Sequence, residues 1–188
     1  TLFGNNSDET VRFVERSISN IGRKDLPSLL QDFKNAPTDL IVKKYIEKSI
    51  NLDEAIESNR RFPNNVDLAE NRAFNFVDDI YTMDSFLSEF KNSKHKALLC
   101  DKGLTYVKNV SDYEKYIKHF TLQNKYAQEF YKKLVPTINS CSSLKKMQSF
   151  YNKAVNDNDL LKSVSKNFEH SDLVCAYESF SKNPNKKY

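Results

Sequence analysis

The sequence predicts an all-α protein, a single compact domain of about seven to nine helices around one long central helix. Only 3 of the 188 residues are glycine, and hairpins and barrels need glycine wherever the backbone takes a positive φ. Apolar residues recur every three or four positions through most of the chain, which is the spacing of one helix face. Only residues 104–107 suggest a strand, and one segment that short cannot form a sheet.

The chain is long enough to bury a core. Leu, Ile, Val and Phe account for 50 of the 188 residues, a larger share than the roughly 20% below which chains tend to stay disordered. The length fits one domain, which we place at residues 1–180, followed by a basic tail at residues 181–188. No internal repeat stands out, so a solenoid is not favoured.

Apolar spacing and end signals predict a series of helices in the first half of the chain. Gly22 suits the residue after a helix end, Asn51 marks a break, and Pro63 ends a helix. With these boundaries the predicted helices cover residues 7–22, 24–33, 37–50, 51–62 and 66–81.

The second half contains the longest predicted helix, over residues 112–135. Ser111 and Glu114 have the spacing of a capping box at its start, and Pro136 ends it. At more than 20 residues it would measure roughly 33 Å. Shorter helices are predicted at residues 83–90, at 94–100 with Gly103 ending the segment, and at 143–155, 160–168 and 171–180.

Positive charge is concentrated in the second half. Residues 95–188 contain 16 lysines against 9 acidic residues, whereas residues 1–94 contain 13 basic and 16 acidic residues. All six arginines lie at or before Arg72, so the basic half lacks the planar fork that contacts phosphate or guanine with two hydrogen bonds. This argues against sequence-specific nucleic-acid binding. An anionic polysaccharide or lipid surface fits the lysine-rich half, and so does a plain solvated surface.

The sequence lacks the motifs of common catalytic and cofactor sites. The three histidines do not stand at the spacing of a zinc-binding helix, and there is no Cys-x-x-Cys. The three glycines are isolated, so no glycine-rich loop can cradle a phosphate. Asp78 and Asp79 are adjacent and would point about 100° apart on a helix, which makes them a poor acid–base pair. We therefore expect no enzyme activity, no cofactor and no metal site.

The three cysteines leave several arrangements open. The predicted long helix separates Cys100 from Cys141, and a disulfide needs Cα atoms within about 7 Å. Cys141 and Cys175 flank two shorter helices that can fold back, so a Cys141–Cys175 bridge is expected, with Cys100 as a buried free thiol. The alternatives are an unpaired, buried Cys141 or a catalytic thiol at a helix start, which a histidine brought close by the fold would activate.

Two sites match the N-glycosylation pattern. Asn5 and Asn109 each begin an Asn-x-Ser sequence, and Asn109 stands in a predicted exposed turn just before the long helix, where a glycan fits. The chain begins with a residue other than methionine, which either a processed mature form or an artificially trimmed chain would explain. No apolar stretch approaches the roughly 20 residues that span a bilayer. These features together favour a secreted, extracellular protein.

The tryptophan-free, Lys/Asn/Tyr-rich helical character is best seen in residues 124–155, NKYAQEFYKKLVPTINSCSSLKKMQSFYNKAV. In this respect the chain resembles small secreted salivary proteins of blood-feeding insects, especially mosquitoes. The resemblance is one of composition over the whole chain, strongest from residue 111 onward, and it supplies no site residue. It implies a secreted effector that binds host molecules or modulates host haemostasis and immune responses without catalysis.

Three functions follow as expectations. The first is a secreted, non-enzymatic effector that binds a host protein or cell-surface receptor through an exposed helical face. The second is a carrier of a small hydrophobic ligand, in a cavity lined by the aromatic residues Phe74, Phe76, Phe120, Phe130 and Phe150. The third is an intracellular helical interaction domain whose cysteines are reduced.

Overall fold

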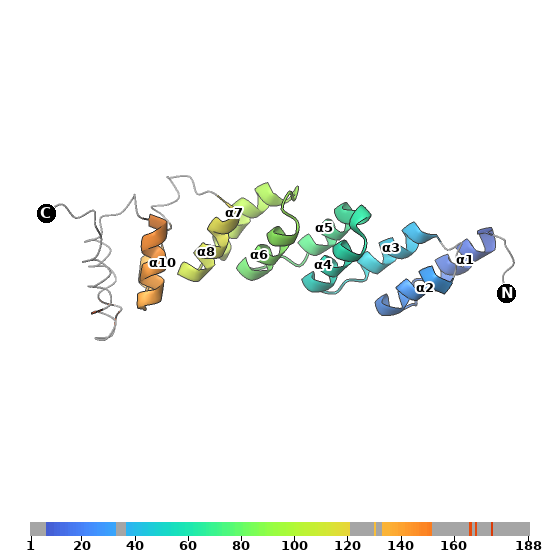
Figure 1. The fold of residues 1–188 in the computed structure, drawn as a ribbon, viewed down its shortest axis with the longest axis horizontal. Helices are drawn as coiled ribbons and strands as arrows, with labels where there is room; N and C mark the ends of the chain where they lie inside the picture. The colour runs from blue at the N-terminus through green and yellow to red at the C-terminus, as the bar shows by residue number, and fades with distance from the viewer. Residues whose placement is uncertain are drawn as a thin grey trace. The chain divides into compact units, whose positions relative to one another are not determined.

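A computed structural model describes residues 7–32, 37–120, 130, 133–151, 166, 168 and 174 of the chain. The secondary structure of these residues consists of nine α-helices and three short 3-10 helices, without a strand. The predicted all-α class is therefore confirmed (Figure 1). None of the described helices is long and apolar enough to cross a bilayer.

The chain folds as two compact units. The first comprises Thr1–Asp78 and Ser85–His95, and the second comprises Asp79–Asp84 and Lys96–Tyr188. The organisation of residues 1–180 as one domain stays a prediction, and the basic tail 181–188 lies outside the described residues.

The first unit contains α1 to α5 and the second half of α6. Their bounds are α1 Ser7–Ser17, η1 Arg23–Asp25, α2 Leu26–Asp32, α3 Thr38–Glu47, α4 Leu52–Arg61, η2 Pro63–Asn65, α5 Val66–Phe74 and α6 Ile80–Glu89. Helix α2 packs against α3, and α4 lies beside α5 (Figure 1). Buried side chains of α1, α2, α3 and the residue that follows α1 meet in one cluster, made by Val14, Ile18, Leu26, Ile41 and Tyr45.

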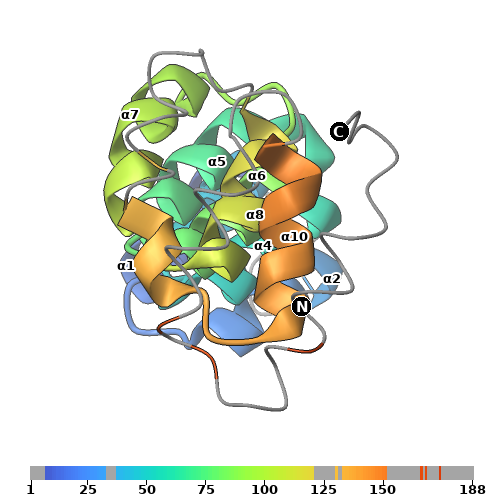
Figure 2. The same ribbon diagram turned by 90° about the vertical axis from the view of Figure 1, so that its left-hand side faces the viewer.

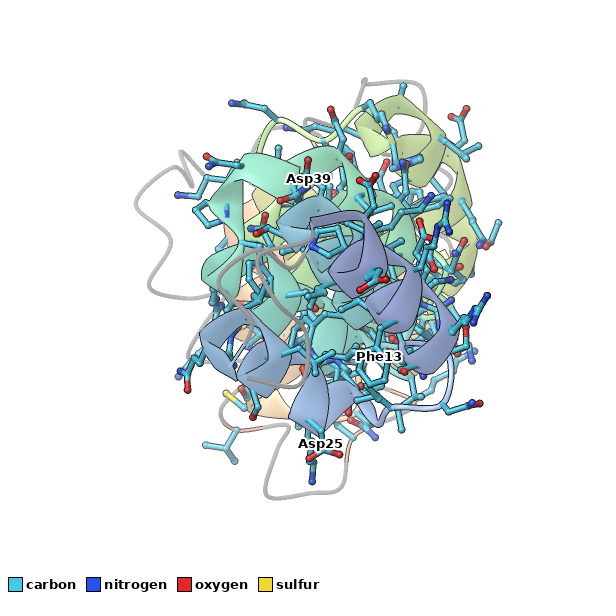
Figure 3. The ribbon with its side chains drawn as sticks, turned by 90° about the vertical axis from the view of Figure 1, so that its right-hand side faces the viewer. Phe13, Asp25 and Asp39 are labelled. Carbon is cyan, nitrogen blue, oxygen red and sulfur yellow. The ribbon has the colours of Figure 1, made fainter. Side chains whose placement is uncertain are left out.

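Two acidic residues at helix starts of this unit, and one aromatic residue of α1, are exposed to solvent. Asp25 in η1 and Asp39 in the first turn of α3 are exposed, as is Phe13 on α1 (Figure 3). Acidic side chains are favoured there because backbone N–H groups at a helix start carry partial positive charge.

The second unit contains the first half of α6 and the remaining elements. These are α7 Lys96–Tyr106, α8 Val110–His119, η3 Val135–Thr137 and α10 Cys141–Tyr151. Helix α10 packs against α8 (Figure 2). The largest fully buried side chains of this unit are those of Met83, Leu99, Leu134, Ile138, Leu144 and Met147.

The prediction of one long helix over residues 112–135 is wrong, because α8 ends at His119. Phe120 has an extended backbone (φ −131°, ψ 133°), and its ring lies 4.9 Å from that of Tyr116. In the last turn, Lys118 Nζ and His119 Nε2 lie 2.8 and 2.6 Å from Asp84 Oδ1 on α6. Basic side chains are favoured in the last turn of a helix, because its carbonyl groups carry partial negative charge. The contacts of Lys118 and His119 with Asp84 also hold this last turn against α6.

Other predicted boundaries also differ from the structure, and three of them concern the packing of α5 to α8. The predicted 66–81 helix is two helices, because Asp79 caps a new one: its Oδ1 accepts from Thr82 N at 2.7 Å. The predicted Ser111 cap is wrong by two residues, since Asn109 Oδ1 accepts from Asp112 N at 3.0 Å and Val110 is thereby buried within α8.

The third difference is at Gly103, which does not end α7 but lies inside it and is buried. A methyl group at this position would lie 2.6 Å from Met83 Sδ and 3.2 Å from the Tyr116 ring. Gly103 is therefore a point of close approach between α7 and the side chains of α6 and α8, where a larger residue would be overpacked.

Candidate functional site

The cysteines differ in what the structure describes. Cys100 is a free cysteine, half-buried rather than buried as predicted, and its Sγ lies 3.3 Å from Tyr116 Oη. Cys141 is the first residue of α10, which Ser140 and Ser143 cap through reciprocal hydrogen bonds. Cys175 lies outside the described residues, so the Cys141–Cys175 bridge stays a prediction. Because α8 is short, a long helix no longer argues against a Cys100–Cys141 pair, but the free state of Cys100 does.

Of the two predicted glycosylation sites, only Asn109 is described. It is exposed, and its side-chain oxygen accepts the helix-capping hydrogen bond from Asp112 N. A glycan would attach to Nδ2, so it is compatible with this cap. Asn5 lies outside the described residues.

The two described histidines occupy packed positions. The His95 ring stacks on Phe74 at 3.9 Å, and its Nε2 lies 3.1 Å from Asn71 Oδ1. His119 Nε2 lies against Asp84, and His170 lies outside the described residues. Within the described part of the chain, no group of three or more His, Cys, Asp or Glu side chains is placed to hold a metal ion.

The aromatic residues proposed to line a cavity are distributed over both units. In the first unit Phe74 packs against Phe86, and Arg72 lies over the Phe76 ring. In the second unit Phe120 and Phe130 are buried and both lie near Tyr116. The side chain of Phe150 lies outside the described residues. Each described ring thus has a packing partner within its own unit.

Several carboxyl groups are held ionised by basic neighbours. A hydrogen bond from Arg23 lowers the pKa of Glu57 below its ordinary value, and one from Arg60 does the same for the pKa of Glu89. Burial opposes ionisation of Asp84, but the contacts with Lys118 and His119 outweigh it and lower the pKa of that carboxyl. A carboxyl whose pKa is lower in the folded state stabilises the fold only while it is ionised.

Stability is therefore expected to be lost in acid. The contribution of these carboxyl groups is complete above their ordinary pKa values of about 4 and falls as the pH drops through the lower folded-state values. Urea unfolding between pH 7 and pH 2 should show this decline, and Asp84→Asn should make it shallower. Asp101→Asn is the control, because Asp101 is exposed and forms no ion pair within the described residues. An unfolding free energy that stays constant down to pH 2 would contradict the expectation.

A chain of polar contacts crosses the first unit from α3 to α5. Tyr45 Oη donates to Glu57 at 2.9 Å, and Arg23 Nη2 donates to Glu57 and to Ser58 Oγ at 2.9 and 3.1 Å. Ser58 Oγ lies 3.3 Å from Ser49 Oγ, and both serines are buried. These side-chain contacts link η1 and α3 to α4, and the contact between the two buried serines joins the segment after α3 to α4.

Arg72 on α5 is the last residue in this series of polar contacts. Its Nε and Nη2 both donate to the carbonyl oxygen of Ser49, the first at 2.9 Å, and its guanidinium lies 4.9 Å from the centre of the Phe76 ring. Arg23 and Arg60 of the same unit pair with Glu57 and Glu89. Arg72, in contrast, forms no ion pair with any carboxylate of the described residues.

Ile50 follows immediately on the carbonyl that Arg72 holds. It is 75% exposed, the largest exposed fraction among the bulky apolar side chains described. Its backbone N–H donates to Glu54 Oε2 at 3.0 Å, and the next residue, Asn51, caps α4 by accepting from Glu54 N. An exposed isoleucine therefore stands on a turn whose backbone is held on both sides.

We call Ile50, Arg72 and Phe76 the Ile50–Arg72 patch. Large apolar, aromatic and arginine side chains dominate the energetics of protein–protein interfaces. The predicted 37–50 helix placed Ile50 at a helix end, but α3 stops at Glu47 and leaves Ile50 in the turn. The break predicted at Asn51 is the sequence signal that locates this turn, since Asn51 caps α4 and directly follows Ile50.

Comparison with known proteins adds no relative of assigned function. No family model matches the chain, and neither a curated protein nor a solved structure matches it.

Proposed function

We propose that this chain is a secreted, non-enzymatic effector that binds a host protein or cell-surface receptor and modulates host immune or haemostatic responses. The observation that supports binding is Ile50, an isoleucine 75% exposed on a turn fixed by hydrogen bonds on both sides. A backbone already held in place loses little conformational freedom on binding, and this favours affinity. The extracellular setting and the host rest on the compositional resemblance to insect salivary proteins and on the exposed Asn109 sequence.

The proposal is tested by competition for host targets. Labelled protein is added to vertebrate whole blood, and saturable binding to cells and to plasma proteins is measured after separation. Unlabelled Ile50→Asp should compete about tenfold or more weakly than wild type, because losing one anchor residue costs more than about 1.4 kcal/mol of binding energy.

Val66→Asp is the matched control, since Val66 is also an exposed aliphatic residue of the first unit, at 43%. It should compete as well as wild type. Absence of saturable binding, or equal competition by both variants, would show that Ile50 is not a binding anchor. Release of a bound small molecule on denaturation of protein from its natural source would instead favour the ligand-carrier alternative.

A further inference from the structure

We propose that the Ile50–Arg72 patch binds a partner segment in which a carboxylate stands beside an apolar side chain. This inference rests on the proposed binding function and names the chemistry of the partner. The proposal is based on the guanidinium of Arg72, which uses only part of its hydrogen-bond donors inside the first unit.

A guanidinium carries five N–H donors arranged along two edges. Arg72 directs the Nε–H edge, with one hydrogen of Nη2, to the carbonyl oxygen of Ser49. The opposite edge consists of Nη1 and the second Nη2 hydrogen, and no carboxylate of the described residues pairs with it. That edge has the geometry that binds a carboxylate with two parallel hydrogen bonds.

The charge of Arg72 is also incompletely solvated. The residue is half-buried, and one face of its guanidinium lies over the Phe76 ring. A half-buried charge that is not paired with a carboxylate attracts one more strongly than a fully hydrated charge does. The carboxylate that this position lacks within the described residues is therefore expected from the partner.

The apolar half of the proposed segment follows from Ile50. Arg72, which belongs to α5, donates to the carbonyl oxygen of Ser49, and that carbonyl is part of the peptide group that joins Ser49 to Ile50. The guanidinium therefore lies within hydrogen-bond distance of the backbone that carries Ile50. A partner segment that brings a carboxylate to Arg72 therefore comes close to the backbone of the residue that carries the exposed isoleucine side chain. An apolar side chain next to the acidic residue would remove Ile50 from water.

The experiment is selection from a phage-displayed library of random 12-residue peptides on the immobilised full chain. Wild type should enrich peptides in which Asp or Glu adjoins a large apolar residue. A synthetic peptide of that sequence should bind Arg72→Glu at least about tenfold more weakly. The same peptide with Lys in place of its acidic residue should regain binding to Arg72→Glu but not to wild type.

Arg60→Glu is the control, because Arg60 is an exposed arginine of the same unit that already pairs with Glu89. It should bind the acidic peptide as wild type does. If circular dichroism shows that Arg72→Glu is unfolded, Arg72→Gln replaces it, and the acidic preference should disappear with the neutral side chain.

The outcomes separate this inference from the proposed function. Peptides whose binding is lost in Ile50→Asp but unchanged in Arg72→Glu would leave the binding anchor standing and overturn the acidic partner. No enrichment, or peptides insensitive to both changes, would overturn both. Retention on heparin that depends on Arg72, without peptide enrichment, would overturn a protein segment in favour of a sulfated polysaccharide.

Discussion

Replacement of Phe86 by alanine is expected to lower the free energy of unfolding by about 3–5 kcal/mol. Phe86 is fully buried in the first unit, and its ring lies 5.1 Å from Phe90, 6.0 Å from Phe74 and 6.3 Å from His95. Removing the ring loses its transfer from water and leaves a cavity that these neighbours cannot fill completely. Urea unfolding followed by circular dichroism measures the loss.

The control for this prediction is Val66→Ala. Val66 is partly exposed at the start of α5, and substitutions at such positions usually change stability by no more than about 0.5 kcal/mol. If Phe86→Ala cost less than about 1 kcal/mol, the ring would not have the packed surroundings described here.

Replacement of Arg23 by methionine should cost about 2–4 kcal/mol. The side chain is only 12% exposed, donates to Glu54 O, Glu57 and Ser58, and lies 4.1 Å from the centre of the Tyr45 ring. Methionine keeps most of the apolar stem but none of the donors, so Ser58 Oγ and the Glu54 carbonyl each lose one hydrogen bond, although Ser58 Oγ still donates to that carbonyl at 2.8 Å. Urea unfolding of the variant beside wild type measures the difference.

Glu57→Gln provides the comparison for Arg23. The Glu57 side chain is 52% exposed, and ion pairs of exposed groups contribute about 0–1 kcal/mol. The glutamine variant should therefore be much less destabilised than Arg23→Met. Equal losses in the two variants would mean that the ion pair, rather than the buried hydrogen bonds and the ring contact, accounts for the role of Arg23.

The sequence was sufficient to predict the helical class and the break at Asn51, because both depend on local chemistry. It failed at residue 120, where the apolar spacing of Tyr113, Ile117 and Phe120 continues in phase past the real helix end. The end of α8 coincides with tertiary contacts, in which Lys118 and His119 contact Asp84, more than 30 residues earlier in the sequence. The sequence around residue 120 contains no pattern that predicts a contact with Asp84.

The candidate site was less predictable than the fold. The sequence shows that residue 50 is a hydrophobic isoleucine, but the exposure of its side chain depends on where α3 ends and on which side of the turn is packed. Arg72 donates to a backbone carbonyl. Because every residue type has such a carbonyl, the sequence cannot predict which residue accepts this hydrogen bond. The cap formed by Asn109 could have been predicted from the sequence, because an asparagine followed three residues later by an aspartate is a signal for a helix start.

The grouping of residues 79–84 and 85–95 with different units has a consequence for dissecting the molecule. A fragment that stops at Asp78 lacks Phe86, which packs on Phe74, and Ser93, whose hydroxyl binds the buried Glu70 at 2.6 Å. A fragment that starts at Lys96 lacks Met83 and Asp84, the neighbours of Gly103 and His119. No single cut yields two intact pieces, so truncation libraries and proteolytic nicking would map the stability of the interleaved segments rather than separate modules.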